Sequence, residues 1–277
     1  MKPEDLVGIA IPVFFILLFI IESRHTARVF EPVNNWRKTG ALFFMLVLVV
    51  GSLVPLLIPV TWLKQHSIFD FSDLGLWGVP VGILATTFFG YWLHRAMHRF
   101  TPLWLGLHQL HHGAKRVDLV GAYFAHPLEI IVKVGLATVV AAYLLGLAPL
   151  VTALVGVFTG LTSLFQHTNI ATPRWLGYLV QRPESHCLHH EHNSQGRNYS
   201  DLPLWDMVFG SFKNPQNFDG KVGFQLNSGP SLKDMLLMRD VNAARTNPPT
   251  VAPTGDGVDV RRSTLETCHH RNFKLRR

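Results

Sequence analysis

The chain has 277 residues, and 16% of them are charged, whereas soluble domains average about 25%. Its formal net charge of +7 is not accompanied by a nucleic-acid-binding motif, so nucleic acid is excluded as a partner. Two cysteines in a chain of this length exclude both a disulfide framework and a cysteine-based zinc site. The few charges leave long uncharged runs between them, which predicts an integral membrane protein.

The first uncharged run, Leu6 to Ile21, is slightly shorter than the ~20 residues that span a bilayer. A signal peptide is the alternative, but Glu4 and Asp5 give its start the wrong charge and the residues after Ile21 form a poor cleavage site. We therefore expect a retained first helix. The second run is 40–60, and the third, 74–93, ends directly at His94.

No residue between Val134 and Pro173 carries a full charge, and a run of this length is enough for two spans. The sequence GLAP at 146–149 disfavours a continuous helix. We therefore expect a tight hairpin of two spans, with the turn at 146–149 and the second span ending near Gln166 and His167.

The loops between the first spans predict the orientation. Loop 22–39 contains four basic residues and loop 61–73 contains one, so the positive-inside rule places loop 22–39 in the cytoplasm. The third span then delivers His94 to the cytoplasmic face, and the last span returns His167 to that face. The localisation predicted is a multi-pass protein with its active site on the cytosolic side of either a bacterial inner membrane or the endoplasmic reticulum.

Histidines are the main chemical signal, because ten of the fifteen fall between His94 and His190. Most stand three or four residues apart, a spacing that puts side chains on one helix face. Adjacent histidines diverge by about 100° on a helix, so His111 and His112 would face two neighbouring metal ions, and His189 and His190 repeat this pattern. The predicted ligands of a dinuclear centre are His94, His98, His108, His111, His112, His126, His167, His186, His189 and His190. The predicted non-ligands are His25, His66, His192, His269 and His270.

The chain carries an ordered set of motifs: HRAMH at 94–98, HQLHH at 108–112, HPLE at 126–129, FQHTN at 165–169, HCLHH at 186–190, NY at 198–199 and WDMVFG at 205–210. This set resembles the motifs of the fatty acid hydroxylase/sterol desaturase superfamily. The resemblance covers residues from about 75 to 212. One departure is that some relatives carry a further H-x-x-x-H pair before the last box, where this chain has His167 alone. We expect His126 to supply the tenth ligand in its place.

The resemblance implies an all-α fold: a membrane helical bundle of about four to five transmembrane helices with a cytosolic, histidine-rich helical cap that holds the dinuclear site. Hydropathy, charge and composition, together with the resemblance, divide the chain into a first transmembrane helix and basic cytosolic loop (1–39), a membrane-embedded catalytic domain (40–212), a C-terminal cytosolic extension (213–245) and a flexible basic tail (246–277).

The resemblance also implies two iron ions, O2 and two electrons that hydroxylate or desaturate a membrane lipid, although relatives sometimes purify with zinc. No electron-transfer motif is visible in the sequence, so we expect an external donor, either cytochrome b5-like or ferredoxin-like. Carboxylates and polar groups commonly orient metal-bound imidazoles. The candidates for this role are Glu129, Asn198, Tyr199 and Asp206.

Two other classes of function fit the same residues. A zinc-dependent membrane hydrolase would usually mix histidine with carboxylate ligands and use fewer of them. A metal transporter or sensor would carry its ligands inside the membrane along a pathway, whereas these lie at the ends of spans. The sequence does not choose the lipid, the carbon, the oligomeric state or between hydroxylation and desaturation.

Overall fold

We describe the fold from a computed structural model, which describes residues 3–192, 196–224 and 231–241. Across these ranges the regular elements are helices, and β-pairing is limited to one isolated bridge between Glu191 and Val222. The all-α prediction is therefore confirmed. The predicted tail, 246–277, and the end of the predicted extension lie outside the described residues.

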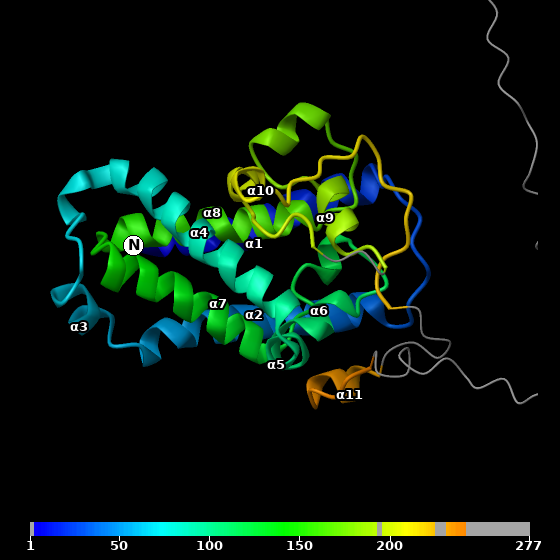
Figure 1. Cartoon of the computed structure of the whole chain (residues 1–277), viewed down its shortest axis with the longest axis horizontal. Coiled ribbons are helices and arrows are strands. Elements are labelled where there is room, and N and C mark those ends of the chain that lie inside the picture. The colour runs from blue at the N-terminus through cyan, green and yellow to red at the C-terminus, as the bar shows by residue number, and fades with distance from the viewer. Residues whose placement is uncertain (1–2, 193–195, 225–230, 242–277) are drawn as a thin grey trace, which may run out of the picture. The chain divides into compact units, whose positions relative to one another are not determined.

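Long apolar helices form the bundle shown in Figure 1. They are α1 (Pro3–Arg24), α2 (Trp36–Leu57), α4 (Gly78–Arg99) with the short η1 (Ser72–Trp77) before it, α7 (Pro127–Val139) continued by η4 (Val140–Leu144), and α8 (Pro149–Gln166). Four segments of the described chain are long and apolar enough to cross a membrane: Trp36–Leu57, Ser72–Arg99, Pro127–Leu144 and Pro149–Gln166. The first predicted span lies in α1, which packs along α8.

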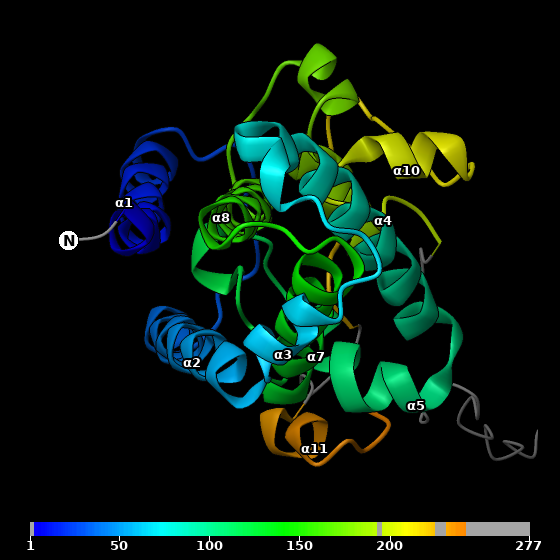
Figure 2. The same ribbon diagram turned by 90° about the vertical axis from the view of Figure 1, so that its left-hand side faces the viewer.

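Figure 2 looks along these helices and shows α7 between α2 and α4, both of which it contacts. Apolar side chains such as Ile16, Leu42 and Leu57 remain exposed on the outside of the bundle. Lipid covers such side chains in a membrane, so their exposure agrees with the predicted spans.

The predicted hairpin is present. η4 ends at Leu144, and Pro149 opens α8 at a position where its fixed φ favours a helix. Gly146 turns the chain with φ +58°, and a Cβ atom there would lie 2.6 Å from the carbonyl oxygen of Phe69. Only glycine meets both conditions without strain.

The uncharged run predicted that the fourth span begins near Val134. In the structure its helix, α7, begins seven residues earlier, at Pro127. Proline is favoured at this first helical position, and His126 before it caps the helix by accepting from the backbone N–H of Leu128. The prediction missed this turn because it contains Glu129 and Lys133. These two side chains form an ion pair, with 2.6 Å between Nζ and Oε1.

Short helices connect or follow the long ones. They are α5 (Thr101–Leu103), η2 (Trp104–His108), α6 (Gln109–His112), η3 (Leu119–Gly121), η5 (Arg174–Tyr178), α9 (Pro183–His189), α10 (Pro203–Val208) and α11 (Leu232–Leu236). In Figure 1, α6 and α9 lie at one end of the bundle and α3 (Val60–Gln65) lies at the opposite end. The histidine-bearing segments therefore share one end of the bundle, as the topology predicts.

A hydrophobic cluster fixes α6 at this end. Leu110 packs with Trp36, Phe124 and Met235, and Met235 of α11 is 1% exposed. Gln109 adds two polar contacts to the chain after α11, since its side chain donates to the Arg239 carbonyl at 2.8 Å and accepts from the Val241 N–H at 3.1 Å. Residues 231–241 therefore support the helix that carries His111 and His112.

Candidate metal centre

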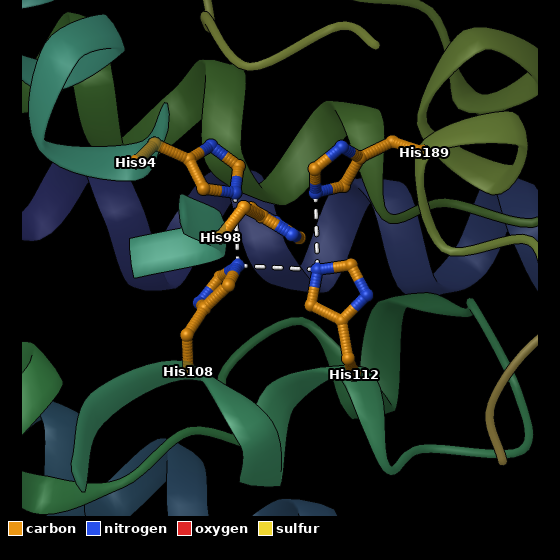
Figure 3. Close-up of side chains that lie close together, drawn as sticks. All are labelled: His94, His98, His108, His112 and His189. Atoms are coloured by element: carbon orange, nitrogen blue, oxygen red, sulfur yellow. Dashed lines mark hydrogen bonds between the residues drawn. The ribbon is translucent and has the colours of Figure 1, made fainter. Parts of the chain in front are cut away.

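Nine histidine side chains come together in two groups. Group one is His94, His98, His108, His112 and His189, and group two is His111, His167, His186 and His190. Within each group the candidate ligand nitrogens all lie within 4.8 Å of one another. Figure 3 shows the rings of group one pointing toward one another from different segments. The spacing of the nitrogens in each group fits a single metal ion.

Helical geometry explains why there are two groups. His111 and His112 are adjacent in α6, so their rings diverge. The Nε2 atom of His112 lies 3.0 Å from Nε2 of His189, whereas Nε2 of His111 lies 3.3 Å from Nε2 of His167. The sequence predicted this division from the spacing alone.

The hydrogen-bond partners of the rings in group one imply tautomers that are arranged for a cation. His94 Nδ1 lies 2.6 Å from the carbonyl oxygen of Tyr199, and a carbonyl can only accept, so Nδ1 carries the proton. His108 Nδ1 bonds in the same way to the Glu129 carboxylate at 3.0 Å. Both Nε2 atoms are then bare lone pairs, yet they lie 2.8 Å apart. A metal ion between them removes this conflict, because neutral imidazole binds metals through such a lone pair.

Group two repeats the arrangement. His167 Nδ1 donates to the Ser163 carbonyl at 2.7 Å, and His111 Nδ1 donates to the Phe124 carbonyl at 3.3 Å. Their Nε2 lone pairs face each other across 3.3 Å. The donor set of each group therefore fits a transition-metal ion that prefers imidazole nitrogen.

The pKa values agree with this protonation. Burial lowers the pKa of His111 to about 3 and the pKa of both His167 and His189 to about 4. Burial, reinforced by neighbouring histidines, also holds the pKa of His112 and His190 well below the ordinary value. Near neutral pH these rings are uncharged, which is the form that binds a metal.

Glu129 is the predicted carboxylate that lies directly on a ligand. Its side chain is 1% exposed, and Oε1 accepts from both His108 Nδ1 and Lys133 Nζ. A carboxylate in this position fixes the tautomer of the imidazole and makes it a better donor.

Of the other three candidates, Tyr199 contacts a ligand through its backbone carbonyl, whereas Asp206 and Asn198 act one step further away. The Asp206 carboxylate accepts from the backbone N–H groups of Tyr199 and Ser200 at 2.8 and 2.9 Å, and Tyr199 in turn holds His94 through its carbonyl. Burial raises the pKa of Asp206. Asn198, at φ +54°, donates to the Ser185 carbonyl in α9 at 3.0 Å. These residues position the segments that carry the ligands.

His126, expected to be the tenth ligand, belongs to neither group. Its Nδ1 atom accepts from the Leu128 N–H that it caps, and its Nε2 atom lies 3.2 Å from the Leu236 carbonyl oxygen. Both ring nitrogens are occupied by the backbone, so the structure does not bring this residue to the centre. His25, His66 and His192, predicted non-ligands, also lie outside both groups, and His269 and His270 lie outside the described residues.

The sequence reasoning missed a buried charged network that holds α9. The Arg182 side chain is 0% exposed, and its guanidinium lies 3.1 Å from the Glu184 carboxylate. Arg28 contacts the other oxygen of Glu184 at 3.2 Å. The sequence does place two charged residues, Arg182 and Glu184, immediately before the last histidine motif, which could have indicated an ion pair there. Their partner Arg28 is far away in the sequence and could not be identified from it.

A cavity of about 620 Å³ opens beside group one. Its walls include Trp92, Arg95, Tyr199 and Phe209, and His98 of group one also lines it. The cavity therefore gives a molecule of small size access to a histidine of the centre.

Residues 79–211 match the model of a family described as Fatty acid hydroxylase. The chain is also similar to the human (Homo sapiens) lathosterol oxidase, with 27% identity over 164 residues, which cover 57% of this chain and 54% of the relative. The chain thus spans about half the length of this curated relative. No solved structure matches the chain.

Proposed function

Since residues 79–211 belong to the fatty acid hydroxylase/sterol desaturase superfamily, we propose that this protein is a membrane oxidoreductase that hydroxylates or desaturates a lipid. The reaction would use O2 and two iron ions, with electrons from a separate cytochrome b5-like or ferredoxin-like protein. The active site would lie on the cytosolic face.

The observation that carries the proposal is the convergence of nine neutral imidazoles on two adjacent points, with five donors at one and four at the other. A zinc hydrolase usually has four-coordinate zinc with three protein ligands, often including a carboxylate. Five converging histidines exceed that number and suit iron better. A transport role is disfavoured because both groups lie at helix ends.

The residues of the chain have defined tasks in this proposal. A pair of iron ions, when bound, would supply the reduction of O2 that breaks an unactivated C–H bond. Glu129 and the Tyr199 carbonyl hold His108 and His94 in the tautomer that binds metal. The aromatic walls of the cavity, Trp92 and Phe209, would hold an apolar chain near His98 and exclude water from it.

Metal analysis combined with an activity assay tests the proposal. Purified protein would be loaded with Fe(II), supplied with reductant and lipid extract, and followed by O2 uptake and mass spectrometry. We expect two irons per chain and a lipid product that has gained one oxygen or lost two hydrogens. Stoichiometric zinc without any redox activity, even after iron loading, would refute the proposal. Lipidomics on cells with and without the gene would identify the substrate.

A further inference from the structure

The short helix α10 packs against the side of a membrane span, although it follows the last histidine motif in the sequence. Trp205 Nε1 donates to Thr87 Oγ1 of α4 at 2.9 Å, and the Trp205 ring meets the Phe88 ring edge-on, with centroids 5.0 Å apart. In Figure 1, α10 lies nearer than α6 and α9 to the end of the bundle where α3 lies. Figure 2 shows α10 on the side of α4 that faces away from α7. α10 therefore covers an outer side of α4.

This contact lies inside the span and not at its end. The segment Ser72–Arg99 is long and apolar enough to cross a membrane, and Arg95 is the first charged residue of α4. Arginines near the end of a span reach toward the lipid headgroups. Thr87 precedes Arg95 by eight residues, which is about 12 Å along a helix. The hydrocarbon core is about 30 Å thick, so the contact between α10 and Thr87 lies within one leaflet, below the headgroups.

The outward face of α10 is apolar. Leu204, Met207 and Val208 stand at positions i, i+3 and i+4, which share one face of a helix. All three side chains are exposed, and Val208 is 60% exposed. Phe209, directly after the helix, turns toward α4 instead and stacks on Tyr91 with ring centroids 5.2 Å apart. The face that points away from α4 is therefore the one that has no protein cover among the described residues.

The polar side chains of α10 are satisfied inside the protein. Asp206 is the only charged residue of the helix, and it is 0% exposed. Its carboxylate accepts from the Tyr199 N–H, the Ser200 N–H and the Ser211 hydroxyl at 2.8, 2.9 and 2.7 Å. The Trp205 indole donates to α4 and does not need water. Polar groups at the depth of the hydrocarbon must find their partners within the protein, and those of α10 do.

The neighbouring helix η5 extends this apolar surface. α10 contacts η5, and the Phe212 ring lies 5.6 Å from the Tyr178 ring. Trp175, Tyr178 and Leu179 are exposed, and tryptophan and tyrosine are enriched where a membrane meets water. On its other side, α10 is followed directly by the ring that packs against the exposed Trp92 of α4. The exposed face of η5 and α10 is therefore continuous with the lipid-facing surface of the span.

We propose that η5 and α10 are inserted in the membrane from the side that carries the histidines, and that lipid covers their exposed face. α10 has six residues, far fewer than the ~20 that cross a bilayer, so it enters one leaflet without spanning it. The depth of the Thr87 contact favours lipid over a water-soluble partner protein, because such a partner would have to enter the hydrocarbon to reach Leu204 and Val208. This inference goes beyond the proposed function, since it concerns which surface the membrane covers and not the reaction.

Spin labels at single cysteines test the proposal. Cys268→Ser removes the thiol of the tail, and Cys187, at 0% exposure, stays unlabelled. Nitroxides are attached to Val208→Cys and, in a second protein, to Leu204→Cys, two exposed positions where cysteine fills no core space. The full chain is held in nanodiscs of phosphatidylcholine and phosphatidylglycerol. Electron paramagnetic resonance then compares the rate of collision with O2, which concentrates in hydrocarbon, with the rate for a nickel chelate, which stays in water.

Two reference positions calibrate the measurement. Leu84→Cys places a label on an exposed position of the span α4, and Asp219→Cys places one on an exposed charged position after α10. We expect labels at Val208, Leu204 and Leu84 to collide faster with O2 than with the nickel chelate, and the label at Asp219 to show the reverse order.

Faster collision with the nickel chelate at Val208 and Leu204 would place α10 in water and overturn the proposal. Shielding of both labels from both reagents would also overturn it, and spin–spin broadening that disappears on dilution with unlabelled chain would then identify a second copy as the cover. Nickel access at Leu84 would refute the span itself, and the proposal with it. The measurement involves no turnover, so its outcome is independent of whether the protein oxidises lipid.

Discussion

His112 and His190 stack ring on ring, with centroids 4.2 Å apart and planes at 17°, although His112 belongs to group one and His190 to group two. The first comes from α6 and the second caps α9. The stack therefore joins the two histidine groups and fixes the position of α6 relative to α9.

Replacing one ligand in each group tests the two-group arrangement. His111→Ala and His189→Ala should each abolish product formation and lower the bound iron from two ions toward one, because each removes a nitrogen from a different group. Iron content and membrane insertion would be measured together. His66→Ala is the control, since its exposed ring packs on Trp62. Full activity in either ligand variant would disprove the assignment.

Glu129→Gln should weaken iron binding by about 10–100-fold, because the partner of a metal-bound imidazole sets its basicity and orientation. Competition with a chelator measures the change in affinity. Glu31→Gln provides the control, since the Glu31 side chain is 64% exposed and makes only a long contact with Lys115. Unchanged metal affinity in Glu129→Gln would show that the hydrogen bond to His108 has no influence on the centre.

Arg182→Met should destabilise the folded protein by about 3–5 kcal/mol, because it removes one partner of a fully buried ion pair. Thermal unfolding in detergent, with iron content as a second measurement, would show the loss of stability. Arg182→Lys should rescue little, since lysine cannot reproduce the several directed contacts of the guanidinium with Glu184, Asn214 and Thr172. A Tm equal to that of the unaltered protein would contradict the role of this network in holding α9.

Gly146→Ala should destabilise the protein by about 1–2 kcal/mol, because the position has φ +58° and its Cβ would collide with the Phe69 carbonyl. Gly156→Ala is the matched control. It lies inside α8, where a Cβ would meet nothing within 4 Å, and alanine should stabilise that helix by about 0.5–1 kcal/mol. The difference in Tm between the two variants measures the effect, and equal Tm values would refute the requirement at the turn.

The metal-free protein should lose stability on mild acidification. The folded-state pKa values of His111, His167 and His189, about 3 to 4, lie below the ordinary value of 6.5. As the pH falls below 6.5 the unfolded chain therefore binds protons that the folded chain does not, at about 1.4 kcal/mol per group and pH unit. The Tm should be level above pH 7 and fall steadily from pH 6.5 to about 4. A Tm independent of pH over this window would contradict the burial of neutral imidazoles.

Much of the centre could be predicted from the sequence because its ligands obey local geometry. The divergence of His111 and His112 follows from the rotation of about 100° per residue in a helix, and the division into two groups follows from that divergence. The assignment of His126 failed for an equally local reason. A histidine before a proline at the start of a helix also serves as an N-cap, and spacing alone does not distinguish a cap from a ligand.

Other features depend on pairings that the linear sequence does not contain. The start of α7 was missed because Glu129 and Lys133 look like two charges outside a span until their ion pair is seen. Likewise, Arg28 and Glu184 meet only through the fold. The predicted domain boundaries at 39, 212 and 245 remain predictions.

The α7–α8 hairpin separates the histidines along the chain, and each group takes ligands from both sides of it. During synthesis, His94 to His112 leave the ribosome before the hairpin, and His167 to His190 follow it. Neither group can be complete until the hairpin has inserted and returned to the side where it started. A metal ion would therefore be acquired late in biogenesis, and its retention would mark a chain whose last two spans are correctly placed.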